Sequence, residues 1–228
     1  MSRACESDDM SQIPEIPWIE AADTPWGVRV LDVRAVTQAM IATSADPQCA
    51  ANALSFGHDD GSAFEQAEPL VQRVIGAMIP YRVEGALPDG ALFRPQVMEH
   101  KWAVFYRQSR YRQSSHRQGR IFFVRSWTRK VHVIAELATR EDSVQITRLN
   151  GVFTDEDENP LFTTMTADFL LRSHALGMTY PAPLPEGMEA SPQQAALWCF
   201  QMFGNLARCA THEIIPVHMP EQALKVLL

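Results

Sequence analysis

The stretches HKWAVFYR (residues 100–107) and IFFVRSWTRKVHVIAEL (residues 121–137) decide the fold of this chain. Both are rich in aromatic and β-branched residues, which favour strands, and a polar basic segment separates them. In the first stretch Trp102, Val104 and Tyr106 fall on one face, and alternation continues through the second. The pattern predicts a β-hairpin that is followed directly by a further strand at residues 131–137.

Further strands and helices are predicted on both sides of this hairpin. Strand patterns occupy residues 26–33, 91–93 and 144–153, and helical spacing or caps mark residues 35–43, 69–77, 161–176 and 192–212. Because short links join the consecutive strands, we expect antiparallel pairing. The predicted fold class is α+β: an antiparallel β-meander of about four to six strands with helices packed on one side, including C-terminal helices. Residues 1–25 are interpreted as an N-terminal arm and residues 26–228 as a single domain.

The basic residues are concentrated in the hairpin. Residues 101–130 hold nine Lys or Arg and no Asp or Glu, whereas the whole chain has 20 basic and 27 acidic residues. The remainder therefore has 11 basic against 27 acidic residues, a net charge of −16. An acidic run at residues 155–158 precedes a predicted helix, where carboxylates complement the helix dipole. This separation of charge permits an anionic partner for the hairpin of an otherwise acidic chain.

Composition and motifs exclude several classes of protein. With 46% apolar and 21% charged residues, the chain has enough apolar side chains for a core. No apolar run is long enough to span a membrane, and residues 1–12 lack the apolar segment of a signal peptide, so we expect a cytoplasmic protein. Nucleotide-binding, hydrolase and zinc motifs are absent, and neither a cofactor nor a metal is predicted. The cysteines have no metal-ligand spacing and are interpreted as free thiols: Cys5, Cys49, Cys199 and Cys209.

A predicted ligand-binding set gathers around one arginine and consists of Arg125, Trp102, Trp127, Lys130 and Lys101. A guanidinium beside indole rings suits a phosphate or another anion. An unpaired buried charge is very unfavourable, so Arg125 needs either such a ligand or an internal carboxylate. The alternative interpretation is an ion pair of Arg125 with Asp168 or Glu99, and the frequency of structural ion pairs favours it.

The loop of the hairpin is predicted to bind a partner through its arginines, Arg107, Arg110, Arg112, Arg117 and Arg120. Arginine mixed with tyrosine can also hold nucleic acid, but the net charge of −16 elsewhere would repel a long polyanion. The expected partner is therefore an anionic small molecule or an acidic protein surface. The alternative is a solvated tip whose charge is balanced by the protein's own acids, including residues 155–158.

Proton transfer has a few candidates, namely His132, His100, His58, Asp59 and Asp60. Glycines flank the last three, and they would let the backbone turn these side chains into a pocket. A polar turn explains the same residues without any chemistry, and a histidine on a strand is more often a hydrogen-bonded structural residue.

Part of the hairpin resembles a motif of small uncharacterised bacterial proteins, in which a Lys-Trp strand pairs with a strand ending Arg-Ser-Trp-Thr-Gly. The matching residues are Lys101-Trp102 and the run from Ile121 to Thr128, and Arg129 stands where that pattern has Gly. The resemblance implies a recurring domain and carries no activity.

Three functions are consistent with these patterns. The first is a non-catalytic binding module that recognises an anionic small ligand or an acidic protein surface through the basic, Trp-rich hairpin. The second is an enzyme acting on a phosphate-bearing or nucleotide-like substrate. The third is an immunity- or helper-type protein-interaction domain. A ligand binder needs Arg125 in a concave pocket, whereas an interaction domain has Arg125 satisfied internally.

Overall fold

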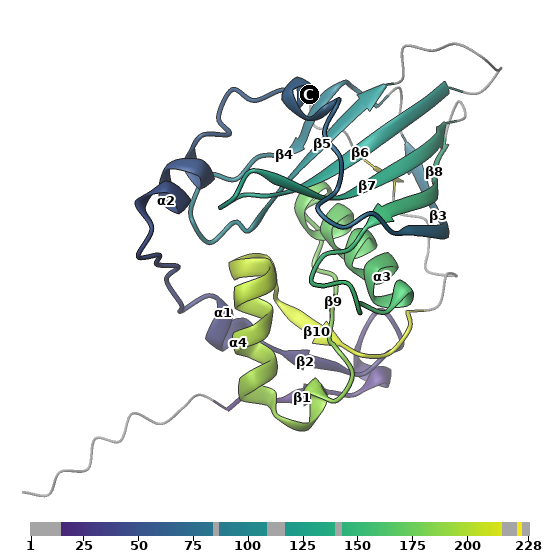
Figure 1. The fold of residues 1–228 in the computed structure, drawn as a ribbon. Helices are drawn as coiled ribbons and strands as arrows, with labels where there is room; N and C mark the ends of the chain where they lie inside the picture. The colour runs from purple at the N-terminus through teal and green to yellow at the C-terminus, as the bar shows by residue number, and fades with distance from the viewer. Residues whose placement is uncertain (1–14, 84–86, 109–116, 140–142, 216–222, 225–228) are drawn as a thin grey trace, which may run out of the picture.

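The computed structural model describes residues 15–83, 87–108, 117–139, 143–215 and 223–224. Seven strands within these ranges form one sheet: β3 (Val74–Val83), β4 (Gly90–Phe93), β5 (Trp102–Gln108), β6 (Arg117–Arg125), β7 (Lys130–Thr139), β8 (Ser143–Gly151) and β11 (Ala223–Leu224). Their order is β11-β3-β8-β7-β6-β5-β4 (Figure 1). All neighbours are antiparallel except β11, which runs parallel to β3. Since β4 to β8 follow one another across the sheet, the predicted α+β fold with an antiparallel meander is confirmed.

Both faces of the central strands are buried, which explains why their sequences are apolar throughout. On one face Trp102 and Phe123 join the main core under the helices. On the other face Phe105 and Phe122 pack against residues 56–64 in a second apolar cluster. The register that places Trp102 opposite Arg125 continues to Gln108 opposite Gly119, so the hairpin is paired along its whole described length.

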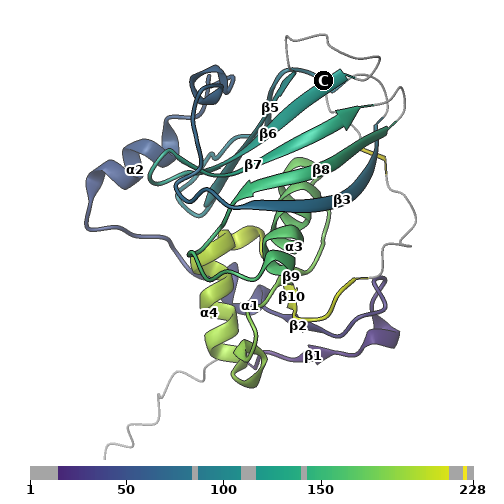
Figure 2. The same ribbon diagram turned by 45° about the vertical axis from the view of Figure 1, so that its right-hand side comes forward.

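A second sheet and the helices complete the fold. The small sheet has the order β1-β2-β10-β9, with β1 (Trp18–Ile19), β2 (Val30–Asp32), β10 (Cys209–Thr211) and β9 (Ala182–Pro183). Figures 1 and 2 show helix α3 (Pro160–Leu170) under the large sheet, with the small sheet beyond it and α4 (Pro192–Phe203) alongside. The shorter helices are α1 (Arg34–Thr37), α2 (Pro47–Leu54), the π-turn η3 (Leu171–Ala175), and the 3-10 turns η1 (Ala21–Asp23), η2 (Ser62–Phe64), η4 (Met188–Ala190) and η5 (Gly204–Leu206).

The helix predicted at residues 69–77 is wrong. This segment leads into strand β3, and its side chains alternate: Ile75 and Ala77 are buried, whereas Val74 and Met78 are exposed. Short apolar runs satisfy both helical and strand spacing, and here pairing with β8 decides between them.

Two other helices are shorter than predicted. The helix that starts after Ser191 ends at Phe203 rather than near residue 212, because Gly204 adopts a positive φ of 72°. The chain then forms β10, which pairs with β2 and β9. The helix predicted at residues 35–43 is only the single turn α1.

The described residues contain no helix with the length and apolar character required to cross a membrane.

Candidate functional site

Arg125 ends strand β6 and lies over the end of helix α4. Its Nη1 and Nη2 atoms donate to the carbonyl oxygens of Met202 and Gln201, each at 2.8 Å. The guanidinium carbon is 5.0 Å from the ring centroid of Trp102, whose Nε1 donates to the same Met202 oxygen at 2.8 Å. The last carbonyls of a helix have no intrahelical donor and carry partial negative charge, so they are suitable acceptors for a guanidinium.

The predicted ion pair of Arg125 with Asp168 or Glu99 is wrong. Asp168 accepts from Arg172 Nε at 2.8 Å, and Glu99 Oε1 accepts from the main-chain N–H of Ala42 at 2.9 Å. No carboxylate of the described residues pairs with Arg125, and burial lowers its pKa to about 10. Arg125 is therefore satisfied internally, by main-chain carbonyls instead of by an acid.

Lys101 lies beside this arginine in the same cluster. Its side chain is buried, with Nζ 3.1 Å from the carbonyl oxygen of Met98 and 4.0 Å from the ring centroid of Trp127. Trp127 Nε1 donates to the same Met98 oxygen at 2.9 Å. Burial, with the nearby charge of Arg125 as the second cause, lowers the pKa of Lys101 to about 8. The structure thus brings four of the five predicted ligand-binding residues together, in contact with the protein's own backbone, while Lys130 is exposed.

Two arginines of the basic loop contact a single glutamate. Arg107 Nε donates to Glu65 Oε1 at 2.7 Å, and Arg120 Nη2 donates to the Glu65 main-chain oxygen at 2.8 Å. These contacts fasten the loop end of the hairpin to the segment that covers its outer face. Arg110 and Arg112 lie outside the described residues, and the side chain of Arg117 does as well.

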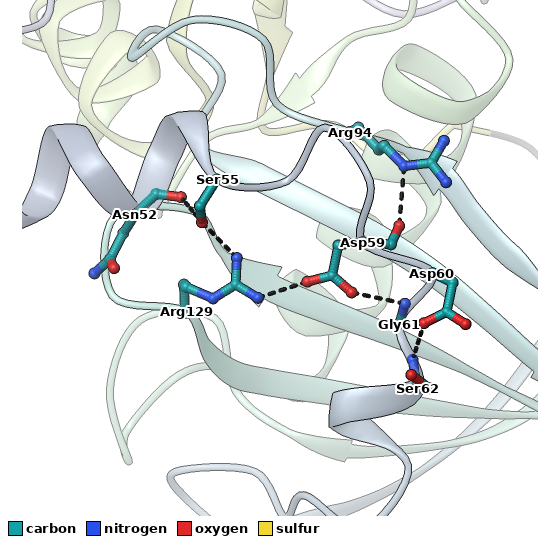
Figure 3. Close-up of polar contacts among 8 residues, drawn as sticks. All are labelled: Asn52, Ser55, Asp59, Asp60, Gly61, Ser62, Arg94 and Arg129. Carbon is teal, nitrogen blue, oxygen red and sulfur yellow. Dashed lines mark hydrogen bonds and ion pairs between the residues drawn. The ribbon is translucent and has the colours of Figure 1, made fainter.

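The turn at residues 58–60 is held by its own hydrogen bonds (Figure 3). Asp59 Oδ1 accepts from the Gly61 N–H and Asp60 Oδ1 from the Ser62 N–H, both at 2.9 Å. Hydrogen bonding by the Ser62 hydroxyl, followed by the bond from the Ser62 N–H, lowers the pKa of Asp60. His58 is exposed. These are the bonds of Asx turns, so the structural interpretation of this segment accounts for the placement of both aspartates.

Arg129 connects this turn to the sheet (Figure 3). Its Nη2 is 2.5 Å from Asp59 Oδ2, its Nη1 donates to Ser55 Oγ at 2.6 Å, and its guanidinium carbon is 4.3 Å from the ring centroid of Phe56. Arg94 Nε donates to the main-chain oxygen of Asp59 at 2.9 Å. Nothing in the sequence marked Arg129 as the partner of Asp59, because the two come from segments far apart in the chain.

The other two histidine candidates are packed among aromatic rings. The His132 ring centroid is 5.3 Å from that of Trp102, and burial, followed by the charge of Arg125, lowers its pKa to about 4. His100 Nδ1 accepts from the Gln96 N–H at 3.2 Å, its ring is 5.2 Å from that of Phe93, and burial lowers its pKa as well. Neutral, enclosed rings of this kind are typical of structural histidines.

His174 was missed by the sequence analysis. It lies on the π-turn η3, its ring centroid is 4.8 Å from that of Phe93, and its Nδ1 is 2.6 Å from Ser173 Oγ. Burial lowers its pKa to about 3. In the sequence it is a single histidine near a predicted helix end, and nothing in that pattern indicates that its ring is buried against Phe93.

A pocket of about 520 Å³ opens on the helical side of the molecule, away from all of the predicted site residues. It is surrounded by the segment before α3, the first turns of α3, the segment after β9, Trp198 of α4 and the residue after β10. Its lining is Thr154, Asp155, Asp157, Glu158, Asn159, Leu161, Phe162, Met165, Leu184, Pro185, Glu186, Glu189, Trp198 and His212. Among the described residues, five carboxylates and no Lys or Arg line this acidic pocket.

The walls of the acidic pocket combine aromatic rings with carboxylates. Phe162 and Trp198 form an edge-type pair with centroids 5.9 Å apart and an interplanar angle of 64°. Glu158 is buried and accepts from the N–H groups of Phe153 and Thr154 at 3.1 and 2.7 Å, so it is part of the fold.

The other four carboxylates are available to a ligand to different degrees. Asp155, Asp157 and Glu186 are exposed. Glu189 Oε2 is buried and has no hydrogen-bond partner in the described part of the chain. Glu189 as a whole is half-buried, but this oxygen is closed to solvent.

The described residues contain no group of three His, Cys, Asp or Glu close enough to hold a metal ion. The carboxylates of the acidic pocket therefore form no such group. Residues 155–158 were visible as an acidic run in the sequence, but Glu186 and Glu189 join them only through the packing of α3 against the β9 segment.

Comparison with known proteins finds no matching family model, no matching curated protein and no matching solved structure. The resemblance of the hairpin to small bacterial proteins stays a prediction.

Proposed function

We propose that this protein is a non-catalytic binding module, and that its ligand is a positively charged organic group held in the acidic pocket. One observation carries the proposal: five carboxylates and, within the described chain, no Lys or Arg surround a pocket whose wall includes Trp198 and Phe162. A cation over an aromatic face is attracted by the ring quadrupole, and this attraction increases when water is excluded. Glu189 lines the pocket as a half-buried acid, and the exposed acids attract the charge from outside.

A binding role is supported over catalysis by the state of the predicted catalytic residues. Asp59 and Asp60 are engaged in a turn, and His100 and His132 are packed among aromatic rings. Arg125, which was a candidate for binding an anion, donates to the end of α4. An anionic ligand at the hairpin stays a prediction, whereas the geometry of the acidic pocket favours a cation. We keep the cytoplasm as the proposed location; the free thiols of Cys49, Cys199 and Cys209 support it.

The guanidinium group is the cation that fits these walls best. It is planar, so it stacks on aromatic rings, and it donates in several directions to carboxylates that do not converge on one point. Its apolar stem would pack against Leu161 and Met165 in the same wall.

The test is calorimetric titration with N-acetyl-arginine amide, a guanidinium on an apolar stem with no carboxylate. N-acetyl-citrulline amide, which has nearly the same shape and no charge, is the matched control ligand. We expect the arginine probe to bind and the citrulline probe not to. Glu189→Gln should weaken binding about 10-fold, because it removes one charge-assisted contact. Glu156 lies between Asp155 and Asp157 in sequence and does not line the pocket. Glu156→Gln should therefore leave the affinity for the arginine probe unchanged. Equal heats for the two probes, or no heat for either, would overturn the proposal.

A further inference from the structure

Lys101 is a buried amine whose positive charge receives little compensation from the fold. The residue is 3% exposed, and its Nζ atom donates to the Met98 oxygen at 3.1 Å, an acceptor that it shares with Trp127 Nε1. The ring centroids of Trp127 and Phe200 lie 4.0 and 5.1 Å from Nζ. Since an ammonium group has three N–H donors, one shared carbonyl oxygen and two aromatic rings satisfy it only in part.

The neighbouring charge of Arg125 is also positive. It lowers the pKa of Lys101 as the second cause after burial, while Glu99 raises that pKa as the smallest of the three causes. Among the residues that the structure describes, no ion pair includes Lys101 or Arg125, and Glu99 Oε1 accepts from a main-chain N–H. Of the two neighbouring cations, the lysine is the one that can lose its proton near neutral pH.

As a result, Lys101 is partly neutral under mild conditions. With a pKa of about 8, about half of the Lys101 amines are unprotonated at pH 8, against less than about 1% for a lysine with the ordinary value of 10.5. A neutral amine has the free electron pair that a nucleophile needs.

We propose that Lys101 is a site of reversible carbamate formation with carbon dioxide. The amine nitrogen attacks the carbon atom, a C–N bond forms, one C=O double bond becomes the C–O⁻ of the carbamate, and the nitrogen releases one proton to water. Residue 101 is then negative, so the charge of Arg125 becomes favourable to it instead of unfavourable. The carbamate nitrogen keeps one hydrogen, which can still be donated to the Met98 oxygen.

The enclosure of the amine selects carbon dioxide among electrophiles. An acyl donor with a large leaving group does not reach a residue that is 3% exposed and has aromatic rings beside its Nζ atom. Carbon dioxide is small and uncharged, so it enters without the penalty of burying a charge. The other lysine in the described part of the chain, Lys130, is exposed and serves as the matched control.

Carbon-13 NMR of the full chain in labelled bicarbonate at pH 8 tests this proposal, because a carbamate carbon gives a line separate from those of bicarbonate and carbon dioxide. We expect a carbamate line that is lost in Lys101→Met and kept in Lys130→Met. A carbamate elsewhere in the chain, such as one on the α-amino group, persists in both variants. A spectrum in which Lys101→Met, shown to be folded by its unfolding midpoint, keeps every carbamate line would overturn the proposal.

A second measurement needs no variant. A trimethyloxonium salt converts a carbamate into a stable methyl ester, and mass spectrometry of the digested natural chain should then find this ester on Lys101. A digest that contains Lys101 only as the unmodified amine would overturn the proposal even if Lys101→Met fails to fold. Both results are independent of the arginine probe, because Lys101 does not line the acidic pocket.

Discussion

At the scale of single residues, Arg125 shows how a buried cation can be satisfied without an acid. Two of its nitrogens reach carbonyl oxygens at the end of α4. Replacing Arg125 with Met leaves those carbonyls without their donors, so we expect the free energy of unfolding to fall by about 2–4 kcal/mol. Urea denaturation measures this. Lys130→Met, which removes the exposed cation paired opposite Arg125, should change stability by less than about 0.5 kcal/mol. A similar loss in both variants would contradict the role of Arg125 at the helix end.

Arg129 combines a favourable side chain with an unfavourable backbone. Its φ of 54° makes it the one non-glycine residue with positive φ among those described, and its side chain pairs with Asp59. Both Arg129→Ala and Arg129→Gly remove the ion pair, but only Gly removes the backbone strain. We therefore expect Arg129→Gly to be more stable than Arg129→Ala by about 1 kcal/mol, and both to be less stable than the natural chain. Equal unfolding midpoints for the two variants would show that the backbone is not strained.

At the scale of elements, Gly204 explains where α4 stops. A Cβ atom there would lie 1.6 Å from the carbonyl oxygen of Glu99, and the residue has a φ of 72°. Gly177 has a similar φ of 64° but meets no described atom within 4 Å. Gly177→Ala should therefore cost about 1 kcal/mol, for the backbone alone. Gly204→Ala must also displace backbone and should cost at least about 3 kcal/mol. Thermal unfolding compares them, and equal losses would mean that the contact with Glu99 relaxes freely.

The sequence predicts a strand or helix well where its apolar residues follow a single period, such as the two-residue alternation of a strand. The alternation at residues 102–106 and 121–125 determines the hairpin, and the observed register agrees with it. The segment at residues 69–77 could not be assigned this way, since its apolar residues fit a helix face until β8 provides the partner strand. The end of α4 was missed although a glycine is a common residue at a helix C-terminus, and the close approach of Gly204 to Glu99 adds a requirement that no local pattern contains.

A binding site is formed by packing between segments that are distant in the chain, so the sequence alone predicts only part of its residues. The cluster of Arg125, Trp102, Lys101 and Trp127 was predicted because a single hairpin holds all four residues. Its acceptors, the carbonyls of Met98, Gln201 and Met202, have no residue-type signal. The acidic pocket could not be predicted either, because its carboxylates come from two segments that only the folded chain brings together.

At the scale of the whole molecule, stability should depend on pH through buried histidines. The pKa values of His132 and His174 are lowered from 6.5 to about 4 and about 3 in the folded chain. Below pH 6.5 the unfolded chain binds protons that the folded chain does not, so stability is complete above pH 6.5 and is lost progressively as pH falls towards 4. Each histidine contributes about 1.4 kcal/mol per pH unit in this window.

Urea denaturation between pH 8 and pH 5 measures this dependence. His132→Gln should reduce the slope of unfolding free energy against pH by up to one proton below pH 6.5, while the slopes of the two proteins coincide near pH 8. If His132→Gln and the natural chain have the same slope of unfolding free energy against pH both near pH 5 and near pH 8, then His132 is not a buried neutral histidine.

The strand order of the small sheet has a consequence for synthesis on the ribosome. Strand β2 (Val30–Asp32) pairs with β1, which precedes it, and with β10 (Cys209–Thr211), which emerges long after it. The nascent chain must therefore carry the apolar residues Val28, Val30 and Leu31 uncovered on that side while the whole meander is translated. Strands β4 to β8 of the large sheet can pair with one another as they emerge in order, so the meander can form before β10 is available to the small sheet. The period in which this chain depends most on protection from aggregation is thus set by the time that translation takes to reach residue 211.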